Sequence, residues 1–288
     1  MSWDLGPLLA RPGLLLGHYV GEFVTPGIGH ILKEAGAEFV FLDMEHSGNG
    51  FETINRGLRY FEAAGVPALV RVPSDSYHHI ARALDIGAEG IIVPMLGSAE
   101  QASEILAKMK YTPKGGRGLG LGLGNDRYRM APAADALAAA NARTRFVALI
   151  ETVDGIRNVE AIAALDGVDV LWVGHADLTA SMGIPGQYDH PDYKDALARV
   201  VRAGKRHRKR LGRLVTDIPG ALAEVEEGWD TLCYHGDAWL LQVAIRQGID
   251  AIRNGVRAGA GKVAPAVTGD ADPKKSKAKA KAKARSKS

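Results

Sequence analysis

Short apolar runs alternate with longer amphipathic stretches along most of the chain. Eight of these runs are rich in β-branched or aromatic residues, and most of them precede a glycine, a proline or a polar residue. This pattern predicts buried β-strands. The predicted strands are Leu15–Val20, Glu38–Asp43, Pro67–Arg71, Gly90–Pro94, Arg145–Glu151, Asp169–Gly174, Leu211–Thr216 and Asp230–His235.

Amphipathic stretches of helical length lie between these runs. Those that we predict as helices are Pro26–Ala35, Tyr77–Ile86, Ala133–Ala142, Pro191–Arg208, Ile218–Glu227 and Ala238–Asn254. A strand followed by a helix, repeated eight times, predicts an α/β protein with a (β/α)8 TIM barrel. A doubly wound open sheet is the alternative, but eight similar units favour closure. We assign residues 1–255 to the barrel domain and residues 256–288 to a linker and tail.

The charge of the chain is unevenly distributed. The sequence has 288 residues, of which 46% are hydrophobic, and this composition fits one large domain. The net charge is +3, but residues 274–288 hold eight Lys or Arg and no acid, which leaves −5 on residues 1–273. The basic tail has no apolar periodicity, so we expect it to be disordered. A solubilising extension is favoured over a weak contact with nucleic acid.

Other features bear on the compartment. The chain has a single cysteine, Cys233, so an intramolecular disulfide is excluded. The N-terminus lacks the basic and apolar regions of a signal peptide, and no run of 18 apolar residues occurs. We therefore expect a cytoplasmic protein without a membrane span.

Polar residues gather at the ends of the predicted strands. In (β/α)8 barrels the active site lies at the carboxyl ends of the strands. Buried charges there are costly unless they are paired, bound to metal or functional. The side chains concerned are Asp43, Glu45, His46, Arg71, Glu151, His175, Asp177, Thr216, Asp217, His235 and Asp237. Their convergence predicts an active site on one face of the barrel.

The residue types suggest roles at that face. Glu151 and Asp177 suit a hard divalent cation such as Mg2+ or Mn2+, although Glu151 could instead cap a helix or form a salt bridge. His46 could act as a general base oriented by Asp43 or another carboxylate, or could be structural. Arg71 could hold a carboxylate or stabilise an oxyanion, or could form a salt bridge at the barrel mouth.

A glycine-rich segment, Gly115–Tyr128, has neither GxGxxG nor GK[ST] and does not lie cleanly between a strand and a helix. We interpret it as a flexible loop over the barrel mouth rather than as a phosphate-binding loop.

Several motifs, in this order and at these spacings, carry a family resemblance from about Leu14 to about Ile252. They are GEFVTPGIGHILKEAGAEFVFLDMEH, LVRVPSDSYHHIARALDIGAEGIIVPM followed by SAEQA, IETVDGIRNVEAI and VGHADLTASMGIPG. The chain resembles the metal-dependent class II pyruvate aldolases of the 4-hydroxy-2-oxoheptanedioate aldolase type, which are related to the citrate lyase β-subunit.

The resemblance implies a metal site and an acid/base group. Glu151 and Asp177 match the metal ligands; Mg2+ or Mn2+ is expected, with Co2+ or Zn2+ as alternatives. His46 matches the proposed acid/base, and Asp43 matches the aspartate that precedes it. Asp85 matches an aspartate that a neighbouring subunit contributes to that histidine.

The resemblance also implies how substrate binds. Arg71 matches the arginine that polarises the substrate carbonyl or enolate. Gly174 and Ala176 match residues whose backbone N–H groups hold the 2-oxo acid carboxylate, and His175 lies between them. Family members are usually hexamers that exchange a C-terminal helix, so we expect a homo-oligomer in which the segment after Asp237 takes this role.

The chain departs from the family pattern at several positions. Leu149 stands where many members have Gln, His175 where many have Pro, and His235 with the glycine after it where a Gly-Ser pair is common. Leu149 removes an amide, and the two histidines add imidazoles near the mouth. These departures bear on substrate choice and rate.

The expected reaction is the reversible cleavage of a 4-hydroxy-2-oxo acid to pyruvate, or an analogue such as hydroxypyruvate, and an aldehyde. Aromatic-compound catabolism is the expected setting, although sugar-acid catabolism uses similar sites. No lysine lies at a strand end suited to a Schiff base, which argues against an imine route. The alternatives are an acyl-CoA lyase of the citramalyl or malyl type and a non-catalytic barrel with a nucleic-acid-binding tail.

Overall fold

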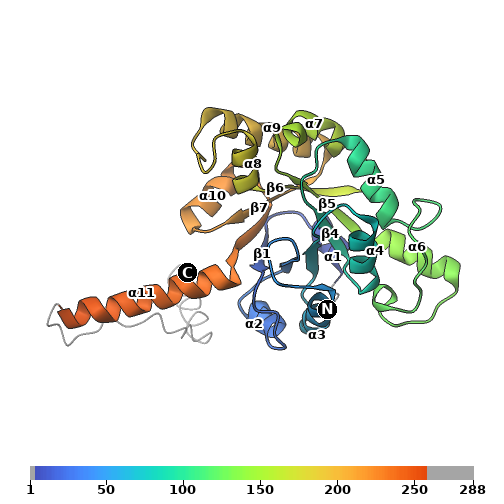
Figure 1. The fold of residues 1–288 in the computed structure, drawn as a ribbon, viewed down its shortest axis with the longest axis horizontal. Coiled ribbons are helices and arrows are strands. Elements are labelled where there is room, and N and C mark those ends of the chain that lie inside the picture. Colours follow the sequence, from blue (N-terminus) through green and yellow to red (C-terminus); the bar gives the residue numbers. More distant parts are fainter. Residues whose placement is uncertain (1–3, 258–288) are drawn as a thin grey trace, which may run out of the picture. The chain divides into compact units, whose positions relative to one another are not determined.

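The computed structural model describes residues 4–257, in which eight parallel strands close into a barrel (Figure 1). Each strand pairs with the next in the chain, and β8 closes the ring by pairing with β1. The strands are β1 (Leu15–Val20), β2 (Phe39–Asp43), β3 (Ala68–Arg71), β4 (Gly90–Val93), β5 (Arg145–Ile150), β6 (Val168–Val173), β7 (Arg210–Val215) and β8 (Thr231–Gly236). The predicted TIM barrel is confirmed, and every strand bound lies within one residue of its prediction.

Helices follow the strands in alternation. They are α1 (Leu5–Ala10), α2 (Ile28–Glu34), α3 (Phe51–Ala64), α4 (Tyr77–Asp85), α5 (Ala99–Met109), the 3-10 turn η1 (Gly124–Asp126), α6 (Ala133–Arg143), α7 (Val153–Ala164), α8 (His175–Ser181), α9 (Pro191–His207), α10 (Ile218–Glu227) and α11 (Asp237–Arg257). Within residues 4–257 no helix is long and apolar enough to cross a membrane.

The apolar residues form two layers because successive side chains of a strand point to opposite faces. One layer packs between the strands and the surrounding helices. The other fills the barrel and takes alternate residues of each strand, such as Phe39 and Phe41 of β2 or Val170 and Trp172 of β6. Gly212 of β7 makes room for this filling, since a Cβ there would lie 2.1 Å from the Trp172 ring.

In each strand every second side chain points into the barrel, and this alternation continues to the carboxyl end of the strand. It therefore positions the functional side chains. Asp43 lies two residues beyond Phe41, and Glu151 lies two residues beyond the inward Leu149. Arg71 likewise follows the inward Leu69. These polar groups therefore lie on the inner surface at the carboxyl end of the barrel, where the fold places active sites.

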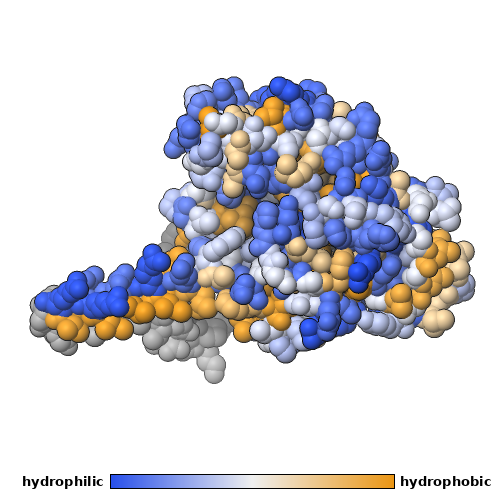
Figure 2. All heavy atoms as spheres, viewed as in Figure 1, coloured by the Kyte–Doolittle hydropathy of each residue, from blue (hydrophilic) through white to orange (hydrophobic). Residues whose placement is uncertain are grey.

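The chain divides after Leu240 into two compact units, and the second begins within α11. Along α11, Leu241, Ile245, Ile249 and Ile252 are exposed and recur three or four residues apart. The helix thus carries an apolar face opposite a polar one (Figure 2). The predicted tail lies, from residue 258 onward, outside the described residues.

Candidate active site

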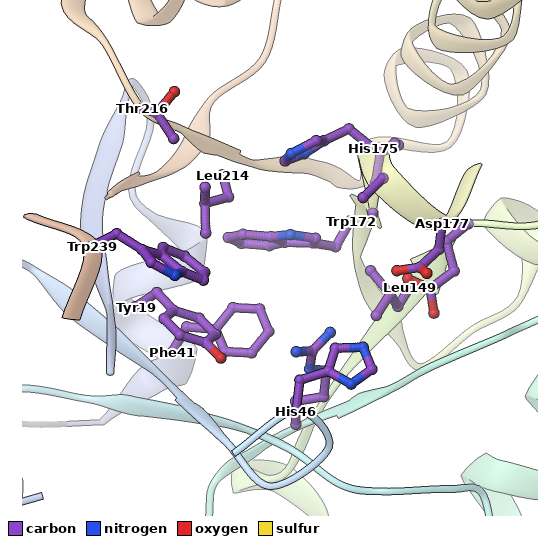
Figure 3. A pocket seen from close by; sticks show the side chains of 15 residues that line it. Tyr19, Phe41, His46, Leu149, Trp172, His175, Asp177, Leu214, Thr216 and Trp239 are labelled. Atoms are coloured by element: carbon purple, nitrogen blue, oxygen red, sulfur yellow. The ribbon is translucent and has the colours of Figure 1, made fainter. Parts of the chain in front are cut away.

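A cavity of about 390 Å³ opens at the carboxyl ends of the strands (Figure 3). Most of the predicted site residues line it, although they come from strands far apart in the sequence. The lining residues are Tyr19, Phe41, His46, Arg71, Leu149, Glu151, Trp172, Val173, Gly174, His175, Ala176, Asp177, Leu214, Thr216 and Trp239.

Arg71 is held in place by two carboxylates. The register of β2 and β3 sets Asp43 beside Arg71. Arg71 Nε donates to Asp43 Oδ1 at 2.7 Å and Nη2 donates to Oδ2 at 2.9 Å, while Nη1 lies 3.0 Å from Glu45 Oε2. A guanidinium has five N–H donors, so some remain for substrate oxygens. The sequence left a salt bridge and a substrate-facing cation as alternatives for Arg71. The structure shows that Arg71 forms the salt bridge and also lines the cavity.

Asp43 is fully buried and serves as an acceptor from several directions. Besides Arg71, the Tyr19 hydroxyl donates to Oδ2 at 2.6 Å. Burial alone would raise the pKa of Asp43, but the hydrogen bonds from Arg71 and Tyr19 outweigh it and hold this pKa below its usual value. Asp43 is therefore ionised and fixes the Arg71 fork.

Glu45 is the carboxylate beside the His46 imidazole. Asp43 Oδ2 accepts from the backbone N–H of His46 at 3.0 Å, whereas Glu45 Oε2 lies 3.9 Å from the imidazole Nε2. The sequence left open whether Asp43 or another carboxylate orients the ring. Glu45, and not Asp43, is the carboxylate that lies next to it. The imidazole side chain is 60% exposed at the mouth, where it can reach a bound substrate.

Glu151 is the most unusual carboxylate of the cavity. Its residue is only 2% exposed, and burial next to Glu45 and Asp177 raises its pKa to about 7, although a hydrogen bond from the Met95 N–H (2.7 Å) opposes the rise. Thr152, not Glu151, caps α7, since its side chain accepts from the Gly155 N–H. The helix-cap interpretation of Glu151 is therefore wrong.

The acidic pair fits a hard divalent cation. A buried carboxylate next to other carboxylates is unfavourable unless a positive charge compensates it. Gly174 makes the close approach of Glu151 possible, since a Cβ on Gly174 would lie 2.2 Å from Glu151 Oε2. In residues 4–257 no cluster of three or more His, Cys, Asp or Glu could hold a metal. Water and substrate oxygens would complete the coordination, as is usual for Mg2+.

Gly174 and Ala176 lie where the first turn of α8 begins, with Gly174 as the N-cap. The first N–H groups of a helix have no acceptor within it, so they are available to an anionic ligand. His175 contacts Tyr188 edge-on at 5.4 Å, and burial together with the Arg213 charge lowers its pKa, so its imidazole is neutral at pH 7.

The departures at Leu149, His175 and His235 fall in different places. Leu149 and His175 line the cavity, and Leu149 is 1% exposed. His235 does not line it; its backbone has φ of 59°, in the left-handed region, and the ring Nδ1 accepts from the Gly236 N–H. A change of substrate choice is therefore expected from the first two positions.

Asp85 is not part of this cavity. It ends α4 and pairs with Arg117 of the glycine-rich segment. The contact predicted between Asp85 and the His46 of a neighbouring subunit stays a prediction. The segment itself packs on the outer helices: the Gly118 N–H donates to the Tyr77 hydroxyl at 2.8 Å. None of its residues lines the cavity, so the interpretation as a loop over the mouth is wrong for the described chain.

Sequence reasoning missed the aromatic side of the cavity, which Trp172 and Trp239 share with Tyr19, Phe41 and Leu214. The alternation along β6 and β7 could have indicated Trp172 and Leu214, because each lies two residues before a position that we assigned to the site. Nothing local indicates Trp239, which lies in the first turn of α11 after the last strand.

Comparison with known proteins places these features in a family context. Residues 24–231 match the model of the HpcH/HpaI aldolase/citrate lyase family. The chain is 32% identical over 223 residues to a 5-keto-4-deoxy-D-glucarate aldolase of Klebsiella pneumoniae subsp. pneumoniae, covering 77% of this chain and 86% of that one. It is 40% identical over 205 residues to a 4-hydroxy-2-oxovalerate aldolase of Novosphingobium aromaticivorans, covering 69% and 74%.

Solved structures agree with the fold. The crystal structure of an HpcH/HpaI aldolase from Desulfitobacterium hafniense superposes with a TM-score of 0.81 at 31% identity, covering 87% of this chain and 96% of that one.

Proposed function

The chain belongs to the HpcH/HpaI aldolase/citrate lyase family, and from this membership we propose that it is a metal-dependent class II aldolase. It reversibly cleaves a 4-hydroxy-2-oxo acid to pyruvate, or a pyruvate analogue such as hydroxypyruvate, and an aldehyde. The observation that carries the proposal is the buried Glu151 carboxylate, which shares one cavity with Asp177 and with the carboxylate-held Arg71.

Glu151 and Asp177 would hold the divalent cation, with Mg2+ or Mn2+ favoured and Co2+ or Zn2+ as alternatives. The cation would supply Lewis-acid polarisation of the 2-oxo acid. The backbone N–H groups of Gly174 and Ala176 bind the substrate carboxylate at the beginning of α8, beside His175.

Arg71 donates to the substrate C2 oxygen, which gains negative charge as the bond breaks. Because Asp43 fixes the guanidinium from the other side, little reorganisation is needed when that charge develops. In residues 4–257 no lysine lines the cavity, so these side chains favour an enolate over an imine intermediate.

His46 accepts the proton of the C4 hydroxyl in the cleavage direction. The C3–C4 bond breaks, the C4 oxygen becomes the aldehyde carbonyl, and the electron pair passes to the enolate of C2 and C3. Protonation at C3 then yields pyruvate. Glu45 next to the imidazole stabilises the charge that His46 gains.

A pyruvate-release assay on a panel of 4-hydroxy-2-oxo acids tests the proposal. We expect EDTA to abolish release and added Mg2+ or Mn2+ to restore it. His46→Ala should lower kcat by about 100-fold, the scale of one acid/base group, with the metal content unchanged. Loss of metal from this variant would assign His46 to metal binding. Cleavage of acyl-CoA substrates only would select the acyl-CoA lyase instead.

We also propose a homo-oligomer in which α11 is exchanged between subunits and Asp85 of one subunit approaches His46 of another. The exposed apolar face of α11 supports this, because an apolar stripe of this length is normally covered. Light scattering on the purified protein should give a mass several times 30.6 kDa. A monomer would contradict the proposal.

A further inference from the structure

The cavity has two chemically different ends (Figure 3). Asp177 and Leu149 lie at one end, and Trp239 and Tyr19 lie at the opposite end, with Trp172 between them. If the 2-oxo acid group binds at the acidic end, the far part of the substrate, which becomes the aldehyde, extends toward Trp239.

The far end is a continuous aromatic wall. The Trp239 ring stacks on Tyr19 with centroids 5.1 Å apart and planes 12° apart. Tyr19 contacts Phe41 at 5.4 Å, and Phe41 meets Trp172 edge-on at 5.5 Å. Trp239 is 47% exposed, so part of its surface is free to cover an apolar group of a ligand.

This end offers little to a polar substituent. The Tyr19 hydroxyl is committed to Asp43. Among the described residues this leaves Thr216 as the other hydroxyl that lines the cavity, and His175 as the one imidazole besides that of His46. A desolvated hydroxyl without a partner costs about 1–3 kcal/mol, so a polyhydroxylated chain would bind poorly.

A second carboxylate would be less favourable still. Arg71 is the one Lys or Arg that lines the cavity in residues 4–257, and Asp43 and Glu45 already hold it. Arg213 of β7 is occupied by Glu224 and by the Tyr193 hydroxyl. An anionic substituent at the Trp239 end would therefore meet no available cation of this subunit.

We infer that the substrate carries an uncharged apolar substituent, aryl in preference to alkyl, on C4, and that Trp239 determines this specificity. The aldehyde released is then aromatic or aliphatic rather than a sugar acid semialdehyde. This inference rests on the proposed aldolase function for its reaction, but the shape and polarity of the cavity carry it.

The test compares kcat/KM for 4-hydroxy-2-oxo-4-phenylbutanoate, 4-hydroxy-2-oxovalerate and 5-keto-4-deoxy-D-glucarate, using the full chain with Mn2+. We expect the phenyl substrate to exceed the dicarboxylic sugar acid by at least about tenfold. Trp239→Ala should lower the ratio of phenyl to methyl substrate by about five- to tenfold, and Trp239→Phe should restore most of it, because an aromatic contact is lost and then replaced. Preference for the sugar acid, or an equal loss on all substrates in Trp239→Ala, would overturn the inference.

If no substrate is cleaved, the proposed aldolase function fails. A binding measurement then still tests the substrate specificity by itself. Calorimetric titration compares 4-phenyl-2-oxobutanoate with 2-oxoglutarate, which has a carboxylate in place of the phenyl ring. Tighter binding of the phenyl compound, weakened about fivefold in Trp239→Ala, supports the specificity. Tighter binding of 2-oxoglutarate refutes it.

Discussion

The raised pKa of Glu151 predicts how the metal-free protein responds to pH. In the unfolded chain a glutamate titrates near its ordinary value of 4.5, whereas in the folded protein Glu151 titrates at about 7. Between these two values the unfolded state loses its proton first. Stability contributed by the protonated Glu151 is therefore fully present below pH 4.5 and is lost as the pH rises toward 7.

The size of the effect follows from the two pKa values. One unit of pKa difference corresponds to about 1.4 kcal/mol, so the interval from 4.5 to about 7 corresponds to about 3 kcal/mol. Because Glu151 is almost completely buried, solvent screening removes little of it. Glu151→Gln cannot ionise and is close in volume. In EDTA it should gain up to about 3 kcal/mol relative to the wild type between pH 5 and pH 8.

Urea unfolding at pH 5 and pH 8, in EDTA and at one protein concentration, measures this difference. Glu104→Gln, at an exposed position on α5, is the matched control and should show no such pH-dependent gain. Adding Mn2+ should stabilise the wild type at pH 8 and leave Glu151→Gln unchanged, because the variant lacks a ligand. A stability difference independent of pH would refute the assignment of Glu151 as the buried, uncompensated carboxylate.

Two further variants test the neighbouring groups. Arg71→Lys removes the bidentate contact with Asp43, so kcat/KM for pyruvate release should fall about 100-fold with little change in Tm. Full activity in this variant would show that the role of Arg71 is purely structural. Gly174→Ala places a Cβ 2.2 Å from Glu151 Oε2, so the carboxylate must move and calorimetry should show metal binding at least about tenfold weaker. Gly48→Ala, with open space around it, should bind metal as the wild type does.

Much of the fold follows from the sequence because its pattern is local. A buried parallel strand needs a short apolar run, and most runs here precede a glycine, a proline or a polar residue, so every strand could be located within one residue. The strand ends then gave Arg71, Glu151 and Asp177 as neighbours in space, since parallel strands in a barrel all end at one face.

The details that decide the chemistry depend on contacts between distant residues. The sequence left open which carboxylate approaches His46. The register of β2 and β3 pairs Asp43 with Arg71, and the path of the chain after β2 then sets Glu45 beside the ring. The position of the glycine-rich segment against the outer helices depends likewise on α4. Gly118 contacts Tyr77 of that helix, although the two residues are 41 positions apart in the sequence.

The sequence by itself determined the barrel, its carboxyl-end site and the residue types available there, because strand periodicity and strand ends are properties of neighbouring residues. Only the tertiary structure decided which of these groups are buried, paired or left without a partner. The stacking of Trp239 on Tyr19 is of this second kind because it depends on the pairing of β8 with β1. The pKa of Glu151 is too, because it depends on burial beside Glu45 and Asp177, which come from other parts of the chain.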